Sequence, residues 1–250
     1  DSINLARSYL FIESYHTDIS ENDSAIKYCL KAKKIFEKLK DLKNLSVIYY
    51  DISSIQTYEC DYFGSNKNVL KAINLAKKIN NNSLLISYND RIAYNSLYLK
   101  EYNKAIEYYL KSDNYYKKNE SYSKSFLFQQ IGYINLMQNK FKTAIRYYKS
   151  SINNYKKDKK NISYPFLIDQ YAFCKLKLKD YSELPKLFFE AEKIRDENNI
   201  DNGRQYNKIY LSEYYAVMKD TAKAIQYAQK AVALSKSFKN PTDVLASLKQ

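Results

Sequence analysis

The sequence predicts an all-α protein, a right-handed superhelical solenoid built from antiparallel helix hairpins. The main observation is an Ala-Ile dipeptide that recurs in lysine- and tyrosine-rich helical stretches, at 25–26, 72–73, 105–106, 144–145 and 224–225. Successive dipeptides are 47, 33, 39 and 80 residues apart, and the last spacing is two steps of 40. Internal repetition with a period of this length is typical of stacked helix pairs. In addition, Gly 3 and Pro 3 supply little of the turn chemistry that a sheet protein needs. Hydrophobic residues, at 45%, suffice for a continuous core.

We expect six hairpins within one solenoid over 1–250, at 3–43, 44–81, 83–119, 122–159, 163–199 and 202–239, and the start of a seventh at 241–250. The first hairpin has a long expected turn, from His16 to Asp23, and residues 61–67 of the second are expected to form an extended loop. Residues 84–118 show the pattern best. One stripe holds Leu85, Ile92, Ala93 and Leu97, and the next helix presents Ala105, Ile106, Tyr109 and Ser112.

The fourth hairpin has small residues, Gly132 and Ala144, where its two helices should cross. Glycine within a helix costs about 1 kcal/mol relative to alanine, so a close approach of the helices explains it better than chance. Phe141 should fill the gap at the turn. In the Tyr147-Tyr148 pair, as in Tyr108-Tyr109, one ring should face the core.

The fifth hairpin departs from the pattern because Leu184 replaces the alanine and Pro185 follows it. Proline fits the first turn of a helix, which Ser182 would cap. The sixth hairpin contains Leu211, Ser212, Ala224, Ala228 and Ala231. Asn240-Pro241 begins a further helix, so we expect the natural protein to continue beyond Gln250.

The order of small and aromatic residues across 84–151 resembles the tetratricopeptide repeat. The later repeats are longer than the family's usual period of about 34 residues. In this respect they are similar to bacterial regulatory proteins that carry such repeats beside an output domain. The resemblance implies a protein or peptide partner in a concave groove lined by the first helix of each hairpin. The implied groove residues are Asp90, Tyr94, Tyr98, Gln129, Tyr133, Met137, Asp169, Phe173 and Lys177.

Packing against the neighbouring repeat is the alternative role for aromatic residues in this groove. We favour packing for Phe126, Phe166 and Leu136, and both roles stay open for Tyr94, Tyr133 and Asp169. Repeats of this family that bind acidic chaperone C-termini use lysines and asparagines at the groove positions. A groove that presents carboxylates instead disfavours such a partner.

The sequence gives no support for catalysis or metal binding. The sequence contains none of the glycine-rich, nucleophile-elbow or zinc-protease motifs. The single His16 and three scattered cysteines, Cys29, Cys60 and Cys174, do not form a metal-binding pattern, and free thiols are the expected state. We therefore predict a non-enzyme that uses no cofactor. No apolar run of membrane-spanning length occurs either.

The formal net charge of +14 invites nucleic-acid binding, but only five of the 41 basic residues are arginine. The lysine run at 156–160 is most simply a solvated loop. The preferred interpretation is a protein-binding sensory or regulatory region of a larger bacterial protein, cytoplasmic or periplasmic. A freestanding adaptor and a nucleic-acid binder with a basic convex face are the alternatives. The sequence leaves open whether the chain forms a homodimer.

Overall fold

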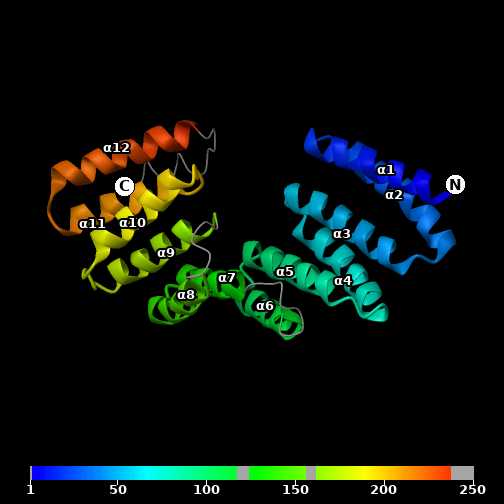
Figure 1. The fold of residues 1–250 in the computed structure, drawn as a ribbon, viewed down its shortest axis with the longest axis horizontal. Helices are drawn as coiled ribbons and strands as arrows, with labels where there is room; N and C mark the ends of the chain where they lie inside the picture. Colours follow the sequence, from blue (N-terminus) through cyan, green and yellow to red (C-terminus); the bar gives the residue numbers. More distant parts are fainter. Residues whose placement is uncertain (1, 117–123, 156–161, 238–250) are drawn as a thin grey trace. The chain divides into compact units, whose positions relative to one another are not determined.

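A computed structural model describes residues 2–116, 124–155 and 162–237, and within these stretches the chain is folded into α-helices joined by short turns (Figure 1). The chain divides into two compact units, 1–122 and 123–250. The first unit contains α1 (Ser2–Asp18), α2 (Asn22–Leu39), α3 (Leu42–Tyr58), α4 (Tyr62–Lys78), α5 (Asn82–Tyr98) and α6 (Tyr102–Tyr116). The second contains α7 (Lys124–Met137), α8 (Phe141–Tyr155), α9 (Tyr164–Lys177), α10 (Leu184–Glu197), α11 (Arg204–Val217) and α12 (Thr221–Ser237).

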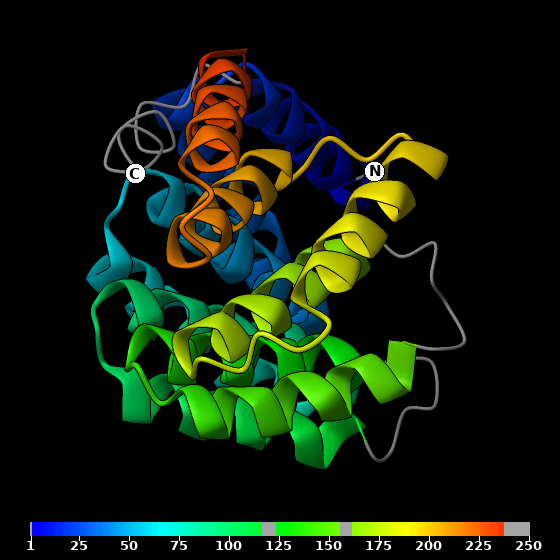
Figure 2. The ribbon, with the colours of Figure 1, turned by 90° about the vertical axis from the view of Figure 1, so that its left-hand side faces the viewer.

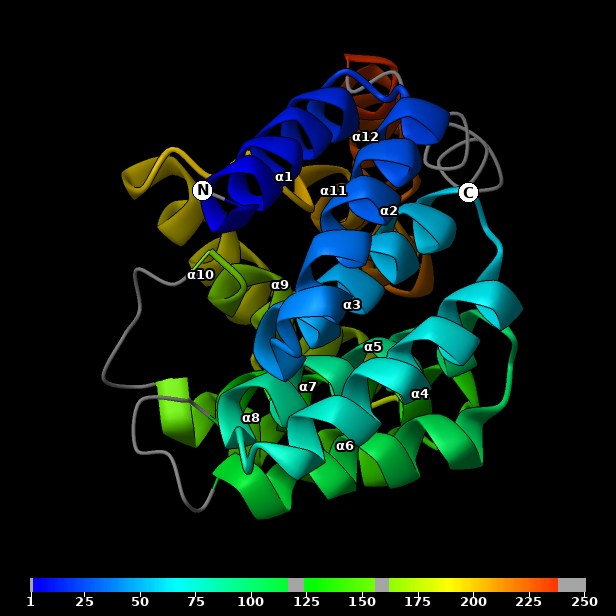
Figure 3. The same ribbon diagram turned by 90° about the vertical axis from the view of Figure 1, so that its right-hand side faces the viewer.

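The helices of the first unit pack in the order of the chain, each against the next (Figure 3). Apolar clusters lie between neighbours: Phe36, Leu45 and Ile48 join α2 to α3, and Val69 and Tyr88 join α4 to α5. All five residues are nearly inaccessible to solvent. Burial of a continuous apolar seam therefore stabilises the stack, and the predicted all-α helical-hairpin fold is confirmed.

The turns of the first unit recur at a constant spacing along the chain. A non-glycine residue adopts positive φ, between 50° and 62°, at Ser20, Lys40, Cys60, Asn80 and Lys100. At each turn the next amide N–H bonds to a carbonyl in the last turn of the preceding helix, as Asp41 does to Phe36 (3.0 Å). This is the Schellman arrangement that glycine usually provides. The helices of this unit thus end in tight turns without glycine. The low glycine content therefore gave no sign of these turns in the sequence.

The second hairpin is regular, and the expectation of an extended loop over 61–67 is wrong. Asp61 is the N-cap of α4, where its carboxylate accepts the Gly64 N–H at 2.8 Å. Asp41 and Asn81 cap α3 and α5 in the same way. The small buried residue that corresponds to Ala25 is Ser65, and not Ala72 of the Ala-Ile dipeptide. The first turn is also short, because α1 extends to Asp18 and α2 begins at Asn22.

In the second unit, α7 and α8 form a tight hairpin (Figure 2). A Cβ on Gly132 would lie 2.6 Å from a ring carbon of Tyr148, whose side chain is fully buried. Gly132 therefore leaves room for the Tyr148 ring, while Ala144 is also fully buried. The hydroxyl of Ser151 donates to the Ser125 carbonyl at 2.6 Å and links the two helices further.

Pro185 lies in the first turn of α10, as expected, but Ser182 does not cap that helix. The residue before α10 is Glu183, which has φ of 62°, and no side chain caps the helix. The three cysteines are free, with Cys29 and Cys174 buried and Cys60 exposed. The expected seventh helix start and the lysine run at 156–160 lie outside the described residues. No described helix is long and apolar enough to cross a bilayer.

Candidate functional site

The first helix of each hairpin carries the nine expected groove residues, three each on α5, α7 and α9, and their exposure increases toward the helix C-terminus. The first position is the most buried: Asp90 is partly buried, whereas Gln129 is 3% exposed and Asp169 is 0% exposed. At the second position, Tyr94 is exposed and Tyr133 and Phe173 are half-buried. The third is open to solvent and holds Tyr98, Met137 and Lys177. The accessible part of this surface is thus the C-terminal half of each first helix.

In the first unit, three tyrosines from α4 and α5 form an exposed aromatic cluster, Tyr62, Tyr94 and Tyr98. The Tyr94 hydroxyl donates to the Tyr98 hydroxyl at 3.0 Å, with ring centroids 4.7 Å apart. Tyr62 stacks on Tyr98 at 5.3 Å. Tyr98 keeps 53% of its surface exposed. The rings hold one another in place, so a partner would meet a preformed aromatic surface.

The pKa values of Tyr62 and Tyr94 in this cluster are raised, so both hydroxyls stay protonated at neutral pH. Burial, and then hydrogen bonding to Cys60, raises the pKa of Tyr62 to about 12. Burial, and then the bond to Tyr98, raises the pKa of Tyr94 above its ordinary value. Neutral tyrosines present an apolar ring with one polar edge, which is the chemistry that protein and peptide interfaces favour.

Arg91 joins α5 to α3 beside this cluster. Its guanidinium lies 5.1 Å from the Tyr50 ring centroid and donates to the Tyr50 hydroxyl at 3.2 Å. It also donates to the Ser54 hydroxyl at 3.1 Å. Sequence reasoning missed this bridge. The position of Arg91 one turn before Tyr94 on the same helix was a signal that it lies beside the cluster. The partners of Arg91 could not be predicted, because they lie on α3, the first helix of the preceding hairpin.

In the second unit, aromatic and charged groups join α9 to α11. Phe173 stacks on Tyr210 with ring centroids 4.4 Å apart. The Lys177 Nζ lies 4.8 Å above the Phe173 ring and 2.6 Å from the Glu213 carboxylate. Met137, on α7, is 46% exposed. This surface is also aromatic, but Lys177 and Glu213 add a charged edge.

Asp169 does not face solvent, which corrects its expected place on an open groove. One carboxylate oxygen lies 2.7 Å from Arg195 Nη2, and the other accepts the Asn207 amide at 2.7 Å. Burial raises the pKa of Asp169 to about 6, although Arg195 and Asn207 lower it. Gln129 is buried as well. A side chain closed off by neighbouring helices cannot meet a partner, so we leave both residues out of the candidate surface.

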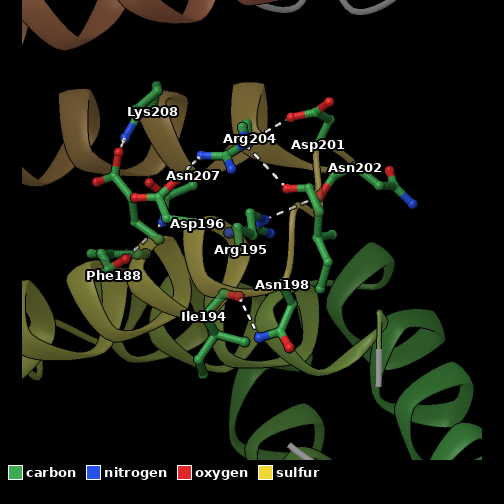
Figure 4. Close-up of polar contacts among 12 residues, drawn as sticks. Phe188, Ile194, Arg195, Asp196, Asn198, Asp201, Asn202, Arg204, Asn207 and Lys208 are labelled. Carbon is green, nitrogen blue, oxygen red and sulfur yellow. Dashed lines mark hydrogen bonds and ion pairs between the residues drawn. The ribbon is translucent and has the colours of Figure 1, made fainter. Parts of the chain in front are cut away.

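The Asp169 pair belongs to a polar network that joins α9, α10 and α11. Arg195 also donates to the Asn202 carbonyl at 3.1 Å, and Asn207 donates to the Phe188 carbonyl at 3.0 Å (Figure 4). Gly203 has φ of +80°, and a Cβ there would lie 3.0 Å from the Arg195 guanidinium. The fully buried ion pair and its hydrogen bonds thus join the three helices α9, α10 and α11. Among the described residues, no group of acidic, cysteine or histidine side chains forms a metal site.

Comparison of the fold with solved structures identifies the architecture. RapI in its apo form has a TM-score of 0.74 at 14% identity, with 94% of this chain and 98% of that chain covered. A signal transduction ATPase (STAND) protein with a tetratricopeptide repeat sensor, from Pyrococcus horikoshii, has a TM-score of 0.82 at 14% identity. That match covers 95% of this chain and 38% of the other. The chain has the tetratricopeptide-repeat fold.

The same tetratricopeptide-repeat fold occurs in a Rap protein complexed with competence and sporulation factor. Its TM-score is 0.66 at 12% identity, and 96% of this chain and 72% of that chain are covered. No family model and no curated protein sequence matches the chain. The likeness is therefore one of repeat architecture, and the predicted resemblance to tetratricopeptide repeats is confirmed at the level of the fold.

Proposed function

We propose that this chain is a non-catalytic scaffold that binds a protein or peptide through the exposed C-terminal halves of its first helices. The observation that carries the proposal is the preformed tyrosine cluster on α4 and α5. Tyr94 and Tyr98 are exposed by 38% and 53%, yet their rings are fixed by mutual contact. Ordered aromatic side chains lose little entropy on binding and often supply most of an interface's affinity.

In the second unit, the proposed contacts are the accessible residues at the corresponding positions, Tyr133, Met137, Phe173 and Lys177. Phe173 and Lys177 are already held by Tyr210 and Glu213. A partner that contacts them would combine an apolar or aromatic segment with a polar group near the Lys177–Glu213 pair. The similarity to a Rap protein in complex with a factor and to a repeat sensor supports a regulatory or sensory role, as part of a larger protein.

The proposal is tested by comparing two double variants as affinity baits in extracts of the source cells. Tyr94→Ala with Tyr98→Ala removes two rings of the cluster, and we expect the recovery of specific partners to fall about 10-fold or more. Leu70→Ala with Leu110→Ala is the matched control, because both leucines are 46% exposed but lie on second helices. Equal recovery of every partner by both variants and the wild type would contradict the proposal.

Nucleic-acid binding remains a second candidate because of where the charge lies in the first unit. The second helices α2, α4 and α6 carry four carboxylates and eleven lysines: Lys27, Lys31, Lys33, Lys34, Lys38, Lys67, Lys71, Lys77, Lys78, Lys104 and Lys111. The three helices contain no arginine, and some of these lysines lie over tyrosine rings, as Lys111 does over Tyr108 at 4.1 Å. This candidate requires binding to a duplex or single strand at low salt that weakens steeply as salt rises.

A further inference from the structure

A hollow of about 670 Å³ opens in the second unit between α8, α9 and α10, away from the candidate surface. Three apolar side chains line it, Ile152, Ile168 and Leu187. Five polar side chains complete the lining: Lys149, Asn153, Tyr164, Tyr171 and Glu190. Pockets that hold small ligands have about this size, and they combine an apolar lining with a few polar groups.

The polar groups of this hollow are not used by the fold. Within the described residues, none of the five side chains forms a hydrogen bond or an ion pair with another side chain or with the backbone. The Tyr164 ring packs in the core, and its hydroxyl is open to solvent in the hollow. The polar groups of the hollow are accessible to solvent and are free to bind the polar groups of a ligand.

The first unit contains a corresponding hollow, and the two hollows differ in their charged lining residues. It is about 430 Å³ in volume and lies between α4, α5 and α6. Ile73 and Asn74 there occupy the repeat positions of Ile152 and Asn153, and Leu70 occupies that of Lys149. In the same way, Lys111 lies at the position of Glu190. Both hollows thus arise from the repeat geometry, but their charged groups differ.

In the hollow of the first unit, the side chains of Lys111 and Asn89 already have partners outside the lining. Lys111 lies 2.7 Å from the Glu107 carboxylate and over the Tyr108 ring. The buried Asn89 donates to the Leu85 carbonyl at 2.6 Å. The hollow of the second unit instead has a cation on α8 and a carboxylate on α10, on the two helices that pack against α9. Lys149 and Glu190 do not pair with each other, so each can meet an opposite charge on a ligand.

We propose that this hollow binds a small zwitterion with an apolar side chain, an amino acid or a short peptide with free ends. The ligand carboxylate would meet Lys149, and its ammonium group would meet Glu190. The apolar side chain would pack on Ile152, Ile168 and Leu187, and the Tyr164 hydroxyl would supply one neutral hydrogen bond. The site is separate from the first-helix surface, so it stands or falls independently of the proposed scaffold function.

Calorimetric titration of the whole chain with three probes tests the ligand chemistry. The probes are L-leucine, leucyl-leucine, and leucyl-leucine blocked by acetyl and amide groups. We expect one of the two zwitterions to bind with 1:1 stoichiometry, and the blocked peptide to bind at least about 10-fold more weakly. Tighter binding of leucine or of the dipeptide tells which ligand length the hollow accepts. No binding of either zwitterion at about 1 mM would overturn the proposal.

Three variants locate the binding. Lys149→Met and Glu190→Gln each remove one charge at the rim and should weaken the zwitterion about 10-fold, without loss of helix content by circular dichroism. Tyr164→Phe removes only a hydroxyl and should weaken it several-fold. Lys111→Met changes the corresponding position of the first unit and should leave affinity unchanged. If Glu190→Gln and Lys149→Met bind as the wild type does, the ligand is elsewhere and the assignment is wrong.

Discussion

At the scale of single residues, repeat position alone does not decide whether a side chain faces a partner. Asp90, Gln129 and Asp169 share one position on successive first helices, and they looked like groove residues for that reason. Asp90 instead accepts the Ser112 hydroxyl of α6 at 2.7 Å, and Asp169 pairs with Arg195. Each of those partners lies on the next helix of the chain, so the periodicity of one helix cannot show them. One turn later, Tyr94 is exposed and Tyr133 is half-buried, and their contact with a partner stays a prediction.

Asp51, on α3, should make stability depend on pH. Burial, and then the nearby Glu13 carboxylate, raises the pKa of Asp51 to about 7. Between about pH 4 and pH 7 the unfolded chain releases this proton while the folded chain keeps it, so the term lowers stability as pH rises. Asp51→Asn removes the effect, and we predict a melting temperature about 2–4 °C higher than wild type near pH 8.

The matching measurement near pH 4 should show little difference between Asp51→Asn and the wild type, because the carboxyl group is largely protonated in both states there. Thermal melts followed by circular dichroism give both comparisons. Asp18→Asn is the control, since this carboxylate is exposed at the end of α1. An equal change in melting temperature at both pH values would mean that altered packing, and not the protonation of Asp51, causes the stability change of Asp51→Asn.

At the scale of elements, the sequence predicted most helices but misplaced boundaries in the first two hairpins. Ala25, Ala105, Ala144 and Ala224 are all buried in second helices, as the Ala-Ile dipeptides indicated. The dipeptide at 72–73 misled because Ser65 performs the small-residue role in that hairpin. Ser65 can replace alanine there because its hydroxyl bonds to Thr57 and Asn95, at 2.9 and 2.8 Å. Serine is normally interpreted as a surface residue, and the sequence does not show the hydrogen-bond partners that allow Ser65 to be buried.

The hairpin of α7 and α8 depends on the absence of a side chain at Gly132. A methyl group there would lie 2.6 Å from the buried Tyr148 ring, which has no room to move. Overpacking of this kind costs about 1–3 kcal/mol, and only part is offset by the higher helix propensity of alanine. We predict that Gly132→Ala lowers the free energy of unfolding by about 1–2 kcal/mol in urea denaturation.

Ser150→Ala is the matched control, because it adds no atom near Tyr148 and its side chain is exposed on α8. It should cost clearly less than Gly132→Ala. The double variant with Tyr148→Leu adds a direct check, since removal of the ring should abolish most of the penalty of the alanine. Strictly additive effects of the two substitutions would show that Gly132 and Tyr148 are not coupled.

At the scale of the whole molecule, stability should come from neighbouring helices rather than from one central core. In the first unit, each helix packs mainly on the next along the chain, from α1 and α2 through to α5 and α6. Repeat proteins of this kind behave as one-dimensional arrays, whose pieces fold if enough neighbours remain. Three hairpins form the first unit, which is compact by itself.

We therefore predict that residues 1–122, expressed alone, fold into a helical domain with a cooperative thermal transition. Three repeats are about the minimum for independent stability, so the fragment should melt below the full chain. Circular dichroism and amide exchange would measure this, with slowed exchange expected in α3 and α4, which have neighbours on both sides. Fragment 1–80 is the control, because it lacks α5 and exposes Val69 and Ala72, which pack in the α4–α5 cluster. Should both fragments be equally unfolded, the units would depend on contacts that neighbouring repeats do not supply.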